Sequence, residues 1–378
     1  AQEQAAHPFL QQRNLLRLSM RTAAEGRAAS TPLRLTLLLD ASGSMERVDR
    51  QQAVELALGH LATQLQPQDQ VTLISFARRP RLVAEGVGGS EMQGLLQKVR
   101  EIPSEGGTNL ESALMLAMEK AKEQQDASAQ NRIILITDGA ANLGDAEPET
   151  LASHIESMRN QGIAFDAAGI VADGLNDEIL EALTRKGDGR YYLLDRPEDA
   201  DARFASQIAG ALRPAAKNVK VQVEFNPKRV KSYKLLGFEK HRLKKEDFRN
   251  DKVDAAEMAA EEAGVALYHF EADAAGEGDV GSVSVRFRDM ATGQMVERRW
   301  PVPYQPSAPR IDEAPDSMRL ATVASMTAAK LKGDAVGEYI DWKSLSQFAE
   351  TLSGNCREQK RVADLITMIA QARGIAGE

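Results

Sequence analysis

The chain reads Leu35-Thr36-Leu37-Leu38-Leu39-Asp40-Ala41-Ser42-Gly43-Ser44 near its start, and this stretch decides the expected fold. A short apolar run followed by turn residues is typical of a strand buried inside a sheet. One carboxylate and two hydroxyl groups, on Asp40, Ser42 and Ser44, follow the carboxyl end of that strand two residues apart. The pattern alone is weak evidence of a site, because Asp, Ser and Gly are also common in ordinary loops.

Two later segments bring further oxygen ligands to the same expected edge. Gly106-Gly107-Thr108-Asn109-Leu110 places a hydroxyl on a glycine-rich loop ahead of a helical pattern. The strand-like run at 132–137 ends at the carboxylate of Asp138. Oxygen-only ligands suit a hard divalent cation such as Mg²⁺ or Mn²⁺, and they suit zinc or copper poorly. The three segments together therefore predict a cation site.

In this order, Asp-x-Ser-x-Ser, a distant Thr and a distant Asp resemble the metal-ion-dependent adhesion site of von Willebrand factor type A domains. The resemblance implies that Ser42, Ser44 and Thr108 supply hydroxyl ligands, and that Asp40 and Asp138 act directly or through water. It also implies Mg²⁺ as the bound ion, with Mn²⁺ or Ca²⁺ as alternatives. Because three neutral hydroxyls and two carboxylates leave such an ion electrophilic, we expect it to bind an Asp or Glu of a partner protein.

Composition excludes several classes of function. A chain of 378 residues is long enough for two or three domains. Its formal net charge of −8 argues against nucleic acid or an anionic membrane as the main partner. The lone cysteine, Cys356, excludes an intramolecular disulfide framework and a Cys-rich metal site. No apolar run approaches the ~18 residues that a bilayer crossing needs, so we expect no transmembrane segment.

Between about residues 30 and 213, strand patterns alternate with helical patterns. We expect strands at 33–39, 71–77, 81–84, 131–137, 163–170 and 190–194. We expect helices near 47–65, 90–100, 110–125, 148–161, 176–186 and 198–212. This alternation predicts a doubly wound, mostly parallel α/β sheet with helices on both faces. The ligand crevice of such a sheet lies at the carboxyl ends of its strands, where Asp40 and Asp138 fall.

After Pro214 the pattern changes to strand-like alternation, with strands expected at 219–225, 229–237, 264–271, 283–288 and 294–302. This indicates an antiparallel β-sandwich-like domain, which a strand at 14–22 joins. Residues 1–12 are expected to be mobile, and 240–262 to be an irregular excursion with one short helix. Helical spacing at 317–332, 342–352 and 360–372 predicts C-terminal helices that pack on the β domain or form a small cap. The predicted organisation is a 1–29 N-terminal segment, a 30–213 type A domain, a 214–305 β domain, and a 306–378 linker with helices.

Later stretches resemble one bacterial lineage of the type A family, which carries a conserved C-terminal extension of unassigned function. The resemblance rests on the segments His7-Pro8-Phe9, Val223–Pro227, Tyr233–Glu239 and Glu246–Ala255. Members of that lineage look exported, as periplasmic proteins or lipoproteins, which implies a periplasmic or envelope location. The lineage carries a longer region ahead of the His-Pro-Phe segment, so we expect a trimmed, proteolysed or variant N-terminus here.

The favoured function is a non-enzymatic, cation-dependent protein-binding module for adhesion or assembly. Two alternatives stay open: a structural envelope component whose metal only rigidifies the fold, and a metal-assisted phosphohydrolase. The enzyme lacks an obvious general base, and the five histidines show no zinc-ligand spacing.

Asp173–Asp177 fits a turn ending in a helix cap better than a second cation loop. Asp166 interrupts a strand, and we expect it near the strand end, facing solvent or an arginine. The partner, the ion and the oligomeric state stay open.

Overall fold

The structure is a computed structural model, and it describes most of the chain. The described residues are 1–21, 31–138, 148–170, 177–194, 214–237, 248–249, 256–259, 263–289 and 292–378. The helix expected at 198–212 and most of the Asp173–Asp177 segment lie outside them.

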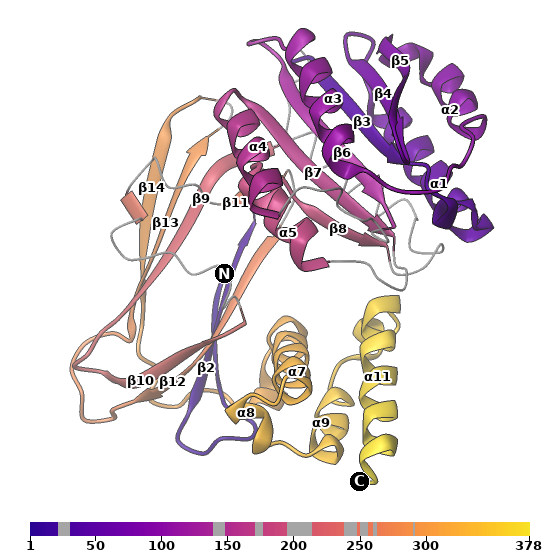
Figure 1. The fold of residues 1–378 in the computed structure, drawn as a ribbon. Helices are drawn as coiled ribbons and strands as arrows, with labels where there is room; N and C mark the ends of the chain where they lie inside the picture. The colour runs from indigo at the N-terminus through magenta and orange to yellow at the C-terminus, as the bar shows by residue number, and fades with distance from the viewer. Residues whose placement is uncertain are drawn as a thin grey trace.

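A six-stranded sheet forms the α/β part of the molecule (Figure 1). Its strands are β3 (Leu33–Asp40), β4 (Gln70–Phe76), β5 (Pro80–Gly88), β6 (Gln130–Thr137), β7 (Ile163–Ile170) and β8 (Tyr191–Leu194). They lie in the order β5-β4-β3-β6-β7-β8, and all neighbours are parallel except the β4–β5 pair. The central strand β3 therefore delivers Asp40 to the carboxyl edge of the sheet.

Helices cover both faces of this sheet. They are α1 (Val48–Gln64), α2 (Met92–Arg100), α3 (Leu110–Glu123), α4 (Pro148–Asn160) and α5 (Asp177–Lys186). Leu37 of β3 packs in the core under α1 and α2, whereas the next residue, Leu38, packs in the core under α3, α4 and α5. Because successive strand residues point to opposite faces, the continuous apolar run of β3 fills both cores at once. The predicted doubly wound α/β arrangement is confirmed.

Asp166 departs from the expected position. It is the fourth residue of β7 and is fully buried, so the expectation of a solvent-facing strand end is wrong. The Arg132 guanidinium on the neighbouring strand donates to it, with 2.8 Å between Nε and Oδ2. The other expectation, an arginine partner, is confirmed, because a buried carboxylate in mid-sheet requires a compensating charge.

Two four-stranded antiparallel sheets follow. The first has the order β1-β2-β12-β10, with strands β1 (Gln2–Ala6), β2 (Asn14–Arg21), β12 (Ala263–Ala272) and β10 (Val230–Leu236). The second has the order β11-β9-β13-β14, with strands β11 (Ala256–Ala259), β9 (Pro214–Phe225), β13 (Gly281–Asp289) and β14 (Met295–Val302). Side chains of both sheets meet in one core, in which Leu16, Phe270 and Val283 are buried. The β2–β12 pairing brings together strands that the whole α/β region separates in sequence (Figure 1).

Two expectations about this region are wrong. Residues 2–6 form β1, which pairs with β2, and Ala5 is fully buried. Residues 256–259, expected within an irregular and helical excursion, form β11, which pairs with β9. In both places an Ala-rich or polar composition gives no strand signal, and pairing with another strand overrides local preference.

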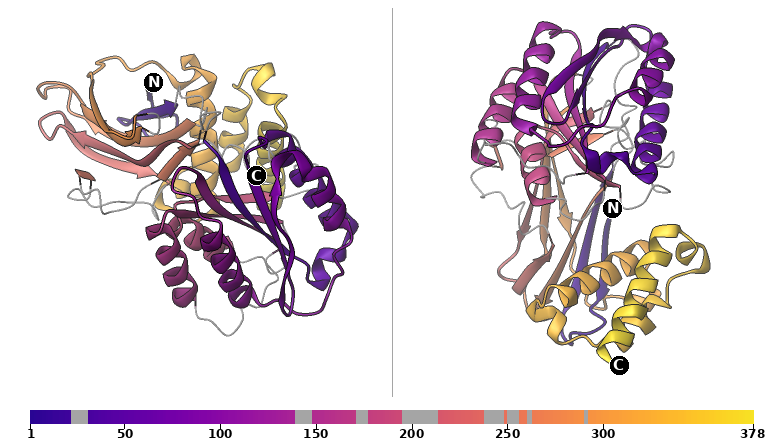
Figure 2. Two further views of the ribbon diagram at one scale, coloured as in Figure 1. Left: turned by 90° about the horizontal axis from the view of Figure 1, so that it is seen from above. Right: turned by 45° about the vertical axis from the view of Figure 1, so that its right-hand side comes forward.

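The C-terminal helices pack on the outer face of the first antiparallel sheet. They are α7 (Asp316–Leu331), α8 (Ala335–Glu338), α9 (Trp342–Ala349), α10 (Gly354–Arg357) and α11 (Lys360–Ala376). Leu15 of β2 lies in their core with Met318 and Leu345, whereas its neighbour Leu16 faces the other sheet. The right-hand view of Figure 2 shows these helices as a separate group below the α/β part.

The direction of two strands and the composition of the helices complete the description of the fold. The arrowheads of β7 and β8 point toward the side of the molecule on which α11 lies (Figure 1). None of the helices in the described part of the chain combines the length and the apolar content that crossing a bilayer requires.

Candidate metal centre

The first element of the candidate site is the turn that follows β3. Asp40 is the last residue of the strand, and its Oδ1 accepts a hydrogen bond of 2.9 Å from the backbone N–H of Ser42. The hydroxyls of Ser42 and Ser44 lie 3.0 Å apart. Asp40 and Ser42 are buried, with 2% and 5% of their surface exposed. The strand end thus brings one carboxylate and two hydroxyls together, as the sequence predicts.

The second element is the loop before α3, which runs beside the first turn. Glu105 N–H donates to the carbonyl of Ala41 at 3.0 Å, and Ser104 Oγ donates to the carbonyl of Ser42 at 3.0 Å. Ser42 and Glu105 also form an isolated parallel β-bridge. The segment that leads into the glycine-rich loop is therefore attached to the Asp40–Ser44 turn by one backbone and one side-chain hydrogen bond.

Thr108 lies between these contacts of Ser104 and Glu105 and the start of α3. Asn109 N–H donates to the carbonyl of Ala77 at 2.8 Å, and the Asn109 side chain caps α3 by accepting from Ser112 N–H at 2.9 Å. Gly107 has a φ of 89°, a left-handed conformation that favours glycine. Thr108, which is half-buried, is thus held at the carboxyl edge of the sheet.

The third element is Asp138, which directly follows β6 and is fully buried. A guanidinium N–H of Arg50 donates to Asp138 Oδ2 and to the carbonyl of Ser44, the latter at 2.7 Å. The preceding residue, Thr137, donates its hydroxyl to Asp40 Oδ2 at 2.6 Å. Asp138 is therefore connected to both ends of the first turn, through Arg50 and through its chain neighbour.

The electrostatics of the pair of carboxylates favour a nearby cation. Burial raises the pKa of Asp40 above its ordinary value, and the negative charge of Asp138 raises it further. Hydrogen bonds from Thr137 and Ser42 oppose this rise in pKa. A positive charge between the two carboxylates would stabilise their ionised forms.

The donor set fits a hard divalent ion. Asp40, Ser42 and Ser44 converge within one turn, and Asp138 and Thr108 approach from two other segments at the same edge. Within the described residues, no three His, Cys, Asp or Glu side chains cluster as a metal site would require. A cation held here would therefore depend on hydroxyl oxygens as well as carboxylates, a set suited to Mg²⁺, Mn²⁺ or Ca²⁺ and unsuited to zinc.

Sequence reasoning missed three residues of this centre. Ser104 and Thr137 donate to the first turn, but hydroxyl residues are too common in loops and strand ends to stand out. Arg50 had a usable signal, because it occupies the inward-facing stripe of α1 at helical spacing. The buried residues of that stripe are Arg50, Ala53, Val54, Ala57, Leu58 and Leu61.

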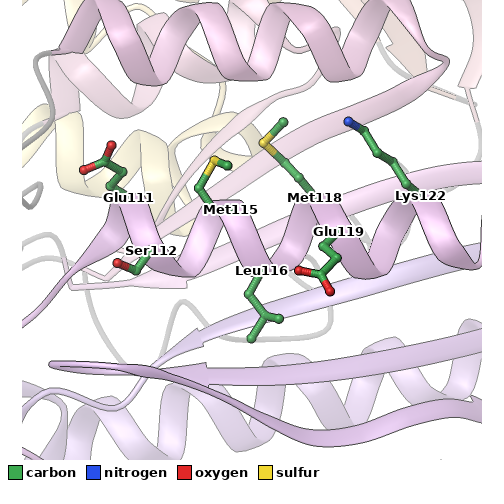
Figure 3. Close-up of a pocket in the computed structure, with 7 residues that line it drawn as sticks. All are labelled: Glu111, Ser112, Met115, Leu116, Met118, Glu119 and Lys122. Atoms are coloured by element: carbon green, nitrogen blue, oxygen red, sulfur yellow. The ribbon is translucent and has the colours of Figure 1, made fainter.

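A cavity of about 680 Å³ lies elsewhere, along one face of α3 (Figure 3). Every residue that lines it belongs to α3, from Glu111 to Lys122, and none of the five predicted ligands contributes. A single helix cannot enclose a small molecule, so we assign the candidate site to the convergent oxygens at the sheet edge and not to this groove.

Residues 35–140 match the von Willebrand factor type A domain. This match spans the chain from β3 to just beyond Asp138. Residues 210–278 match a second family, described as "Uncharacterized protein YfbK, C-terminal". The match agrees with the lineage resemblance of the later stretches.

Two bacterial relatives extend over most of the chain. "Uncharacterized protein YfbK" of Escherichia coli (strain K12) is 27% identical over 395 residues, which span 99% of this chain and 67% of the relative. "Uncharacterized protein sll0103" of Synechocystis sp. is 24% identical over 307 residues, which span 77% of this chain and 72% of the relative. Neither name states a function.

One solved structure shares the fold over the full length. "von Willebrand factor type A from Catenulispora acidiphila" superposes with a TM-score of 0.54 at 16% sequence identity, covering 100% of this chain and 87% of that one. The chain thus has a type A-like α/β fold with additional antiparallel sheets and C-terminal helices.

Proposed function

We propose that this protein is a non-enzymatic interaction module whose type A domain captures a partner protein through a divalent cation. The observation that carries the proposal is the convergence of Asp40, Ser42 and Ser44 at the sheet edge, with Asp138 and Thr108 on adjoining segments. The type A match suggests a protein-interaction or adhesion-type role.

The residues have distinct roles on this proposal. Ser42, Ser44 and Thr108 would hold Mg²⁺, or Mn²⁺ or Ca²⁺, through their hydroxyls, and Asp40 and Asp138 directly or through water. The bound ion would supply an open coordination position to an Asp or Glu carboxylate of the partner. The three segments set the spacing of these oxygens, and the loops around them provide specificity.

An enzymatic role has less support. Two-metal phosphohydrolases need a second set of carboxylate or histidine ligands. The described part of the chain holds no such cluster, and no histidine hydrogen bond to the centre occurs among the described contacts. The structural alternative, in which the ion only rigidifies the fold, is separated from capture by the experiment below. We further propose an exported, envelope location, on the basis of the lineage resemblance.

The experiment compares three proteins: wild type, Thr108→Ala and the matched control Thr63→Ala. Thr63 lies on α1, where its hydroxyl donates to the carbonyl of His60 and accepts from the side chain of Gln64. Mg²⁺ and Mn²⁺ affinities are measured by isothermal titration calorimetry. Capture from an envelope extract of the source organism is then measured in Mg²⁺ and in EDTA.

The proposal expects Mg²⁺ binding to wild type and to Thr63→Ala, and binding to Thr108→Ala weakened about tenfold, the loss of roughly 1.4 kcal/mol. Wild type and Thr63→Ala should capture a partner in Mg²⁺, and none of the three proteins should capture it in EDTA. Metal binding together with equal capture in EDTA would leave the ion a structural role. Absence of metal binding to all three proteins would refute the proposal.

A further inference from the structure

Arg50 is a buried cation placed inside the candidate centre. It lies in the first turn of α1, and 7% of its surface is exposed. Its guanidinium contacts Asp138 and the carbonyl of Ser44, so it touches two of the three segments that form the centre. None of the chemistry proposed above uses this residue.

The position of Arg50 on α1 makes its burial costly. Ala53, Val54 and Ala57, on the same face of the helix, pack in the apolar core. A guanidinium on such a face loses its hydration, and that loss is compensated only by a close negative partner. Asp138 is fully buried and supplies this partner from a segment 88 residues away in sequence.

The charges indicate what the arginine does. Asp40 and Asp138 carry up to two negative charges at the centre, and Arg50 neutralises one of them. A divalent cation neutralises both and needs the same carboxylate oxygens. A guanidinium and a divalent cation beside one carboxylate also repel each other, and this repulsion is strong where water is excluded.

We propose that Arg50 is an internal cation that competes with the metal for Asp138. This inference rests on the proposed metal site. When the metal binds, Arg50 gives up its contact with Asp138, and when the metal leaves, Arg50 returns and keeps the loops in place. Arg50 thereby weakens metal affinity and keeps the metal-free protein folded.

The chain offers a matched control in Arg47, three residues before Arg50. Its side chain is 65% exposed and pairs with Asp49, at 2.8 Å, on the surface. Arg47→Gln also removes one positive charge, at a position close to Arg50 in sequence, but leaves the contacts of Arg50 with Asp138 and Ser44 intact. A general electrostatic effect of lost positive charge would therefore appear equally in both variants.

The experiment measures Mg²⁺ affinity by isothermal titration calorimetry, and Tm with EDTA and with Mg²⁺, for wild type, Arg50→Gln, Arg50→Lys and Arg47→Gln. We expect Arg50→Gln to bind Mg²⁺ at least tenfold more tightly than wild type, to melt at a lower temperature in EDTA, and to gain more from Mg²⁺. Arg47→Gln should change affinity less than threefold. Arg50→Lys keeps the charge without the fork geometry, so its gain in affinity should be smaller.

The outcomes separate this inference from the proposed function. Tighter Mg²⁺ binding by Arg50→Gln than by wild type, beside little change in Arg47→Gln, would support the competition. Unchanged or weaker Mg²⁺ binding by Arg50→Gln, beside normal binding by wild type, would overturn the role of Arg50 and leave the metal site standing. If Arg50→Gln does not fold in either condition, Arg50→Lys decides by the same comparison. Absence of binding to all four proteins would refute both the metal site and the competition.

Discussion

Replacing Asp166 by Asn should destabilise the α/β part severely while leaving its surface unchanged. Asp166 Oδ2 accepts from Arg132 Nε at 2.8 Å, and Oδ1 accepts from Arg132 Nη2 at 3.3 Å and from Arg190 N–H at 2.9 Å. Only 2% of the surface of Arg132 is exposed, and none of Asp166. The substitution keeps the size of the side chain but removes the negative charge that Asp166 places beside the buried guanidinium.

The expected size follows from this burial. Removing one partner of a buried ion pair costs about 3–5 kcal/mol of unfolding free energy, because the remaining charge stays desolvated. For a domain of 150–250 residues, each kcal/mol lowers Tm by roughly 2–4 °C, so Tm should fall by roughly 6–20 °C. Differential scanning calorimetry, with urea unfolding followed by circular dichroism, measures both quantities.

Glu156→Gln serves as the control. Glu156 on α4 pairs with Arg159 at 3.4 Å and with Lys186 at 3.5 Å and is 42% exposed, so losing these surface pairs should cost less than about 1 kcal/mol. Equal and small effects of the two substitutions would refute the reasoning, because they would show that the Arg132–Asp166 pair is hydrated or dispensable. A double variant with apolar residues at both positions should recover part of the loss.

Two further predictions concern other parts of the molecule. His7 and His269 lie with ring centroids 6.0 Å apart, and burial lowers the pKa of each from 6.5 to about 4. Unfolded histidines take up protons below pH 6.5 that the folded ones refuse, so stability is full above pH 6.5 and falls as pH drops toward 4. The loss should reach roughly 3 kcal/mol for either histidine alone, and His269→Gln should flatten the profile of Tm against pH. Asn109→Ala removes the cap of α3 and should cost about 1 kcal/mol in urea unfolding, whereas Asn160→Ala at the end of α4 should cost less.

Most of the α/β elements could be predicted because their signals are local. The apolar runs of β3, β6 and β7 are unbroken apart from a few polar residues, and helical spacing between them is clear. The observed bounds agree to within one or two residues at most ends, for example Leu33–Asp40 against the expected 33–39. The edge strand β5 is longer than expected, at Pro80–Gly88, because pairing with β4 extends it beyond its apolar centre.

The elements that were missed depend on pairing with other strands. Gln2–Ala6 shows no strand pattern of its own, and its order comes from β2 and from contacts such as Ala6 N–H to the carbonyl of Pro309, at 2.8 Å. Ala256–Ala259 likewise becomes a strand only beside β9. No reading of local periodicity can identify such partners, because the energy that orders the segment belongs to another part of the chain.

The candidate centre divides in the same way, and Arg50 shows where the limit lies. Asp40, Ser42 and Ser44 follow one strand, so their meeting is a consequence of local geometry. The contact of Arg50 with Asp138 spans 88 residues and could not be read from spacing. The sequence could still have indicated that Arg50 has a buried acidic partner, because a charged residue on the apolar stripe of a helix needs a compensating charge. The same requirement connects Arg132 with Asp166. Arg50 and Arg132 thus each compensate a buried carboxylate of the described α/β part, and at the carboxyl edge of the sheet a second buried carboxylate, Asp40, lies near Asp138 and attracts a further cation.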